Sequence, residues 1–223
     1  MGNAMQGLNP ELMAQLSFAD YIENHGSETA HYVESIRQDF SILSGTDIAD
    51  IAHFLCVLHG RHPGVADHAA SRTTDESARD WLIEATAGFA AERAFLTKLT
   101  VAAGPISGVS ADDPSDSAVL GQRKALEMLS QSDRNGCAIG AAIALVADWY
   151  AIRPILESIA LRVGVEARPS MLPSIETTSI LKDRLSETPA LERALNFGSE
   201  QLLNQHRGLW QLLEARRNTR LSQ

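Results

Sequence analysis

The eleven residues from Cys137 to Ala147, CAIGAAIALVA, constrain the fold more than any other stretch of the chain. They carry no charged side chain, so a helix formed from them is apolar on every side and belongs in a protein interior. Asp148, Arg153 and Glu157 interrupt the apolar run before about 20 residues accumulate, which argues against a membrane span. We therefore predict a buried core helix that kinks at Pro154.

One side of this helix carries mostly small residues. At about 100° per residue, seven residues fall within about 60° of one line along the helix. They are Cys137, Gly140, Ala141, Ala144, Asp148, Ala151 and Ile155. Small side chains let a neighbouring backbone approach closely, so we expect other helices to pack around this one. The Gly-x-x-x-Gly spacing of Gly136 and Gly140 is interpreted in the same way.

The rest of the chain also predicts helices. Apolar residues recur at steps of three and four, no stretch alternates as a strand does, and no internal repeat is found. The expected class is all-α, a single bundle of about seven to nine helices with a heme-oxygenase-like or ferritin-like architecture. Residues 1–223 form one domain in this interpretation, with flexible tails at residues 1–8 and 216–223.

Two stretches set the expected connections. A helix over residues 27–43, capped by Ser27, and another from the Ser44 capping arrangement to Gly60 are predicted to form an antiparallel hairpin. The helix from Thr74 to about Ala103 is predicted to be the longest uninterrupted one, and the last helix begins at Thr188 and Pro189.

Composition limits the partners. The 223 residues, 44% of them hydrophobic, can bury one substantial core, and the formal charge of -9 argues against a duplex nucleic-acid partner. No basic region followed by an apolar run marks a signal peptide at the start of this sequence, so we expect a cytoplasmic protein. Cys56 and Cys137 form neither a C-x-x-C pair nor a disulfide framework and are expected to be reduced.

Four titratable residues lie near the middle of the apolar face of a predicted helix. They fall within about 40° of that middle and are His59, Glu92, Asp148 and His206. An unpartnered ion in a core costs several kcal/mol, so each group must be paired, neutral or bound to something. Two carboxylates and two imidazoles from four helices would suit a transition-metal cofactor. The alternative is that each group is satisfied within the core, with Arg153 or Arg93 as the partner of a carboxylate.

The spacing of these residues differs from one well-known pattern. Carboxylate-bridged di-iron bundles use Glu-x-x-His on two core helices, whereas Phe95 stands three residues after Glu92.

A second pattern gathers histidines at one end of the bundle. The predicted hairpin places His31 beside His59 and Glu28 beside His62. Five histidines would then share this pole, namely His25, His31, His59, His62 and His68. The Glu28-x-x-His31 and His59-x-x-His62 spacings are ones that a metal can use. The alternative is a solvated end, where histidines near helix C-termini and a glutamate in a first turn complement the helix dipoles.

No motif fixes a reaction. The chain lacks G-x-S-x-G, Walker, G-x-G-x-x-G and H-E-x-x-H sequences. Cys137 follows a predicted cap at Asp133, so a helix N-terminus could favour its thiolate, although an inert buried cysteine is the more common case. Chain length, helix content and the QDFSIL segment from Gln38 to Leu43 resemble heme-oxygenase-like bundles, including thiaminase-type enzymes of the TenA group. The resemblance covers scattered short pieces, so it implies a fold and no site residues.

Three functions follow as hypotheses. The first is a bundle that binds a small ligand or a transition metal through Glu92, Asp148, His206 and His59, with an oxidoreductase as one such protein. The second is a non-enzymatic interaction protein that forms a homodimer, with buried ion pairs in place of a site. The third is a heme-oxygenase-like enzyme acting on a small organic substrate, with Cys137 as a reactive thiol.

Overall fold

The computed structural model describes residues 17–106 and 114–222. Within these ranges the chain forms nine α-helices and no strand, which confirms the all-α prediction. The helices are α2 (Phe18–His25), α3 (His31–Gln38), α4 (Gly45–His59), α5 (Val65–Arg72), α6 (Arg79–Ala103), α7 (Pro114–Ser130), α8 (Cys137–Val163), α9 (Ile175–Leu185) and α10 (Pro189–Leu221). Three short 3-10 turns join them, η1 (Ser27–Thr29), η2 (Phe40–Ile42) and η3 (Glu76–Ala78).

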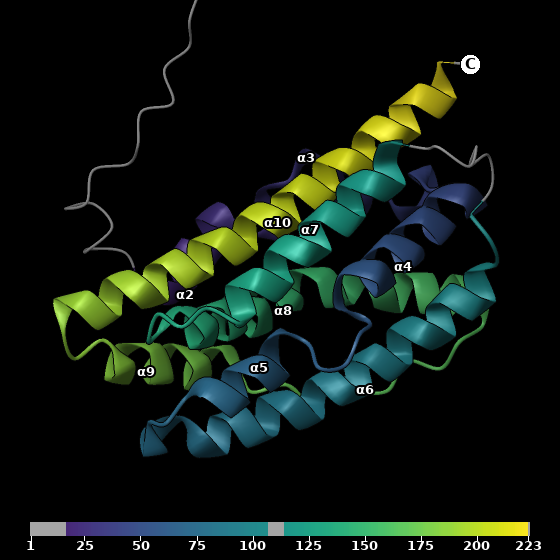
Figure 1. Ribbon diagram of the computed structural model, residues 1–223. Coiled ribbons are helices and arrows are strands. Elements are labelled where there is room, and N and C mark those ends of the chain that lie inside the picture. Colours follow the sequence, from purple (N-terminus) through teal and green to yellow (C-terminus); the bar gives the residue numbers. More distant parts are fainter. Residues whose placement is uncertain (1–16, 107–113, 223) are drawn as a thin grey trace, which may run out of the picture.

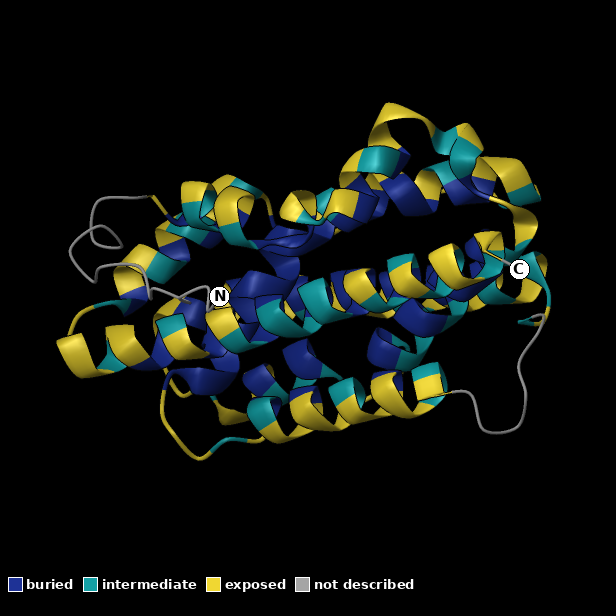
Figure 2. Cartoon of the chain, turned by 90° about the horizontal axis from the view of Figure 1, so that it is seen from above, coloured by how far each residue is buried: buried dark blue, intermediate teal, exposed yellow. Residues whose placement is uncertain are grey.

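The predicted core helix is α8. It contacts α5, α6, α7, α9 and α10, and every residue from Cys137 to Trp149 is buried. By length and composition α8 could cross a membrane, but 83% of its most apolar window is buried inside the fold. Figure 2 shows the buried residues gathered toward the middle of the molecule, with exposed residues on the outer helix faces. The sequence therefore correctly identified the centre of the fold.

Helix α10 lies directly against the small-residue side of α8. A Cβ atom at Gly198 would collide with the carbonyl oxygen of Cys137, and a Cβ atom at Gly140 would collide with that of Leu195. The Ser199 hydroxyl donates to the carbonyl of Gly140 at 2.9 Å. The packing interpretation of the glycine spacing is confirmed, because only glycine allows the two backbones to approach this closely.

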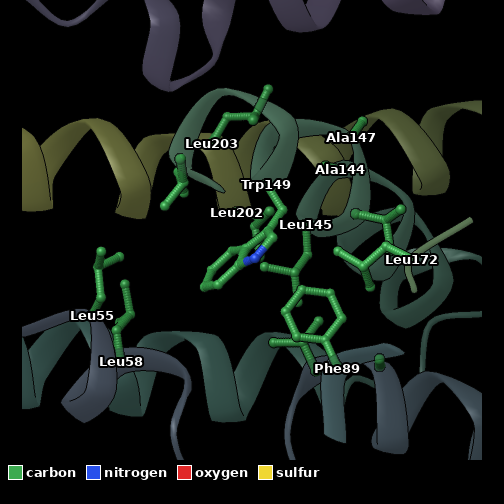
Figure 3. Close-up of a cluster of buried hydrophobic side chains, with 14 of the residues drawn as sticks. Leu55, Leu58, Phe89, Ala144, Leu145, Ala147, Trp149, Leu172, Leu202 and Leu203 are labelled. Atoms are coloured by element: carbon green, nitrogen blue, oxygen red, sulfur yellow. The ribbon is translucent and has the colours of Figure 1, made fainter. Parts of the chain in front are cut away.

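Aromatic and aliphatic side chains fill the space between α8 and its neighbours. Trp149 projects from α8 into a cluster that includes Phe89 of α6, Leu58 of α4 and Leu202 of α10 (Figure 3). The rings of Trp149 and Phe89 are 5.2 Å apart at their centroids and meet edge to face. This geometry is favourable for aromatic pairs, so the cluster fixes the position of the Trp149 indole.

Two of the predicted helix caps are confirmed. Ser44 and Asp47 form a reciprocal capping box at the start of α4, and Thr188 caps α10 with Pro189 in its first turn. Gly136, at φ 92°, precedes α8, so the cap predicted at Asp133 is wrong by three positions. The sequence also predicts a helix start at Asn9-Pro10-Glu11, which lies outside the described residues.

Three predictions about the helices are wrong. Residues 27–43 form η1, α3 and η2 in place of one helix, and α3 packs on α10 rather than along α4 as a hairpin partner. Ser27 is not the cap of a long helix, because its side chain donates to Asp148 instead. The longest described helix is α10, with 33 residues, and not α6, with 25.

The end of the chain is ordered as helix through Leu221. Arg216 and Arg220 donate to the buried carboxylate of Asp50, at 2.8 and 2.5 Å, and Arg220 also pairs with Asp47. The flexible tail predicted from residue 216 is therefore wrong up to Leu221, since these charges pair with buried acids of α4. The tail predicted over residues 1–8 lies outside the described residues.

Candidate functional site

A buried aspartate of α8 lies at the start of a hydrogen-bonded chain. Asp148 is fully buried and accepts three hydrogen bonds. The Ser27 backbone N–H donates at 2.6 Å to Oδ1, the Ser27 hydroxyl donates at 2.5 Å to Oδ2, and His206 Nδ1 lies 2.5 Å from Oδ2. Three donors around two oxygens are the surroundings that an ionised carboxylate needs in a core.

Residue 26 must be glycine for this contact to form. A Cβ atom there would collide with Oδ1 of Asp148, so the turn between α2 and η1 can reach the carboxylate only without a side chain. The Gly26-Ser27 turn thus holds the aspartate together with His206 of α10.

Two histidines continue the chain. His206 of α10 is fully buried, and its Nε2 lies 2.8 Å from Nε2 of His59, the last residue of α4. The rings of His59 and His206 are perpendicular. The rings of His59 and Trp149 also form a T-shaped contact, with their centroids 5.5 Å apart. Four groups, Ser27, Asp148, His206 and His59, therefore form one continuous relay.

The carboxylate determines where each ring carries its proton. With Asp148 ionised, His206 Nδ1 carries the proton that it donates, so in the neutral ring Nε2 is a lone pair. That lone pair accepts from Nε2–H of His59, which leaves His59 Nδ1 unprotonated. No described residue is a hydrogen-bond partner of that atom. His59 thus ends the relay with a free basic nitrogen.

Burial keeps His59 neutral. Loss of hydration lowers its pKa well below 6.5, and the neighbouring His206 lowers the pKa further. Since a cation in this position would lose its water without gaining an anion of its own, the neutral base is the stable form at neutral pH.

Glu92 belongs to a separate ion pair. It lies in α6, 1% exposed, bonded to the guanidinium of Arg153 and to the indole N–H of Trp149 at 3.1 Å. Arg153 is also bonded to the carbonyl of Arg168 and stacks over the ring of Phe95, 4.5 Å from its centroid. For Glu92 the structure thus shows the satisfied core partner that the sequence offered as the alternative.

The four residues predicted as metal ligands are all buried, but they do not converge on one point. His59, His206 and Asp148 follow one another in a line, and Glu92 is paired with Arg153. Among the described residues, no group of three or more His, Cys, Asp or Glu side chains is arranged to hold a metal ion. The metal site stays a prediction, which elemental analysis of protein purified without a histidine tag would check.

His59 lies in the wall of a cavity between α4, α5, α6, α7 and α8. The volume of this cavity is about 180 Å³. Leu58, Phe89 and Leu145 form buried parts of the wall, whereas exposed residues such as His62 and Gln131 lie at its rim. A ligand entering between the exposed residues would therefore meet the His59 side chain in the wall.

Arginines dominate the charge of this cavity. Arg61, Arg93 and Arg123 line it, with Glu127 as the carboxylate in the wall. In a chain with a net charge of -9, this concentration of guanidinium groups marks a local field that favours anions.

The histidine-rich pole forms only in part. His59, His62 and His68 line the cavity, but His25 bonds the carbonyl of Tyr21 and His31 pairs with Glu214 of α10 at 2.6 Å. Glu28 is paired with Arg37 and is not beside His62. The prediction of five histidines at one pole is wrong, because it rested on a hairpin between α3 and α4 that does not exist.

Two participants were missed in the sequence. Ser27 was read as a helix cap, and nothing local indicates that its hydroxyl and amide reach Asp148. Arg123 lies on the inward side of α7, at four and three residues from the buried Val119 and Leu126. The helical projection that found the four titratable residues would also have found Arg123 on this shorter helix.

Cys137 has no place in the site. Its thiol is 1% exposed in the first turn of α8, with Sγ 4.0 Å from the carbonyl oxygen of Leu129. It does not line the cavity that contains His59.

Fold and site together define an all-helical bundle in which a buried aspartate and two histidines lead to a cationic cavity. The chain belongs to the family described as "Family of unknown function (DUF6975)", which matches residues 22–221. No curated protein and no solved structure matches the chain. The heme-oxygenase-like or ferritin-like architecture therefore stays a prediction.

Proposed function

We propose that this protein binds a small polar ligand in the cavity between α4, α5, α6, α7 and α8 and transfers a proton at Nδ1 of His59. The observation that supports the proposal most directly is the free Nδ1 of a neutral, nearly buried histidine in a cavity wall, with its other nitrogen tied to His206. A general base needs this combination of an available lone pair and a fixed ring.

The relay provides a route for the charge that such a transfer creates. When Nδ1 of His59 takes a proton from a ligand, the Nε2 proton of His59 can pass to Nε2 of His206. His206 then becomes an imidazolium, and its positive charge lies 2.5 Å from the carboxylate of Asp148. The ligand keeps the electron pair of the broken bond to hydrogen. His206 and Asp148 act as positioning residues that stabilise the charged state.

The proton positions can be measured without any ligand. Nitrogen-15 NMR of side-chain histidine nitrogens should show His59 with protonated Nε2 and unprotonated Nδ1, and His206 with protonated Nδ1. If His59 instead carries its proton on Nδ1, its lone pair is on Nε2 and faces His206. Nδ1 then cannot accept a proton, and the proposal is wrong.

Reactivity can be tested with p-nitrophenyl acetate, an activated ester whose hydrolysis is accelerated by an imidazole base. The His59→Gln variant keeps an N–H that can donate to His206 but has no basic nitrogen. We expect the protein-catalysed rate at pH 7.5 to fall by about 10²-fold or more, the lower end of what a positioned general base contributes.

The matched control is His31→Gln, which removes one exposed imidazole far from the cavity wall. This variant should keep the wild-type rate. Equal rates for the wild type and His59→Gln, with both proteins folded by circular dichroism, would show that His59 is not a catalytic base.

A further inference from the structure

Arg123 of α7 is a cation in the cavity wall that has a hydrogen-bond donor left unused by the described residues. The residue is half-buried, and its Nε is buried without a hydrogen-bond partner among the described residues. A buried N–H of a guanidinium that lacks a partner costs free energy, and more so for a charged group. Arg123 lines the cavity, so an anion there that paired with its guanidinium group would offset part of that cost.

The other arginines of the cavity differ from Arg123. Arg93 donates to Asp67 at 2.9 Å, with both side chains largely buried, so its charge is already balanced. Asp67 also accepts from the backbone N–H of Gly64 at 2.8 Å, which holds it in place. Arg61 is exposed at the rim, where water hydrates it. Arg123 is therefore the cation with most to gain from an anion in the cavity.

The charges fix the class of anion. Arg93 and Asp67 cancel, and Glu127 offsets one of the two remaining arginines, so the arginines and carboxylates of the cavity sum to a single net positive charge. A monoanion matches this charge, whereas a phosphate dianion would leave an excess negative charge beside Glu127. Guanidinium groups also match the planar geometry of a carboxylate.

The remainder of the wall indicates the body of the ligand. The wall contains four buried apolar residues, Leu58, Val65, Phe89 and Leu145. Together with His59 they line a cavity of about 180 Å³. Such a volume holds a molecule of only a few non-hydrogen atoms beyond the anionic group. An apolar carbon chain can contact these side chains while the charged end faces Arg123.

We propose that the cavity binds a small organic monocarboxylate, with its carboxylate on Arg123 and its carbon chain against Phe89 and Leu145. This inference rests on the proposed function, since it names the ligand class of the same cavity. It places the carbon chain beside His59, where a proton of the ligand would be transferred.

The test is an NMR titration of the full-length protein with butyrate, in amide spectra that include Gly64, Val65 and Arg123. Butyramide, which has the same shape without the charge, and inorganic phosphate are titrated in parallel. We expect butyrate to shift the cavity signals, butyramide to bind more weakly, and phosphate to bind more weakly than butyrate.

Two variants with the same change of charge locate the binding group. Arg123→Gln should weaken butyrate binding by about ten- to a hundred-fold, the usual loss for a hydrogen bond to a charged group. Lys124→Gln lies next to it on the exposed side of α7 and outside the cavity wall, so it should bind butyrate as the wild type does.

Several outcomes would overturn the inference. Butyrate and butyramide could bind equally well, or a folded Arg123→Gln variant could bind butyrate as the wild type does. Phosphate could bind more tightly than butyrate. Finally, butyrate could leave the cavity signals unshifted at a concentration 100-fold above the roughly millimolar dissociation constant expected for so small a ligand. The proton positions of His59 are measured in the same samples without ligand. If they are as predicted and butyrate fails to bind, only the ligand class is wrong; if they differ, the proposed function itself fails.

Discussion

Asp148 shows how a protein interior can hold a carboxylate without a cationic side chain of lysine or arginine. A backbone amide, a hydroxyl and an imidazole supply its three hydrogen bonds. Removing one member of such a buried arrangement leaves the remaining polar groups without partners, which usually costs more than the intact arrangement contributes. The free energy of unfolding should therefore fall even when a relay residue is replaced by one of the same size.

Asp148→Asn is expected to lower the free energy of unfolding by about 3 kcal/mol, because the amide NH₂ faces donors and the charge beside His206 is lost. Urea denaturation at pH 7.5 measures the change. The same substitution at Asp133, whose side chain is 99% exposed and paired with Arg72, should change the stability by less than about 1 kcal/mol. Similar values for the two variants would mean that the buried hydrogen bonds of Asp148 contribute little.

Residues of the candidate site could be predicted in part from helical projection. His59, Glu92, Asp148 and His206 were each placed on an inward face, and each is buried. Projection gives the direction of a side chain around its helix but not its height along the bundle or the helix opposite. The pairing of Glu92 with Arg153, and of His206 with both Asp148 and His59, depends on how α6, α8 and α10 cross.

The contact between α8 and α10 is set by glycines on both helices. Gly140 and Gly198 face the backbone of the opposite helix, and the Ser199 hydroxyl bonds the carbonyl of Gly140. This close approach positions the rest of α10, including His206, against α8 (Figure 1). The distance between His206 and Asp148 thus depends on residues two turns away.

Gly198→Ala is expected to lower the free energy of unfolding by about 1–3 kcal/mol, because its new methyl group collides with the carbonyl of Cys137 and overpacks the interface. Gly121→Ala in α7 is the matched control, since no atom lies within 4 Å of a Cβ at that site. It should raise the stability by roughly 0.5–1 kcal/mol through the helix preference of alanine. Thermal and urea unfolding of both variants give the comparison, and a stabilised Gly198→Ala protein would contradict the described packing.

Elements with strong local signals were predicted well, and those that depend on distant contacts were not. The apolar run gave α8, and the caps at Ser44 and Thr188 gave the starts of α4 and α10. Residues 27–43 have helical periodicity, yet they break into η1, α3 and η2 because Ser27 is drawn to Asp148 and Asp39 caps a new turn. The contact with Asp148 spans 121 positions of sequence, so no local pattern reveals it.

The stability of the whole molecule should depend on pH through His59. Its pKa lies well below 6.5 in the folded protein and returns to its ordinary value on unfolding. Between these two values the unfolded chain binds more protons, so stability rises with pH there and is lost as the pH falls below about 6.5. The slope from this one group approaches about 1.4 kcal/mol per pH unit at most.

Urea denaturation of the wild type and His59→Gln from pH 7.5 to pH 5 checks this dependence. The variant should show a shallower loss of stability over that range, because its amide does not titrate. His31 has the opposite effect on the pH dependence of stability, because Glu214 raises its pKa in the folded protein. Its side chain is exposed. The His31→Gln variant removes this contribution from the comparison. Parallel curves for the wild type and His59→Gln would show that another group causes any acid sensitivity.

The relay also begins at an ordinary backbone amide. The N–H of Ser27 donates to Asp148 at 2.6 Å, at the far end from the cavity, so its proton resonance responds to the charge on that carboxylate and on the imidazole behind it. A single peak in a routine amide spectrum therefore reports the protonation state of a histidine pair that lies deep in the bundle. The fold thus contains its own indicator, which can be read from a uniformly labelled sample without altering any residue.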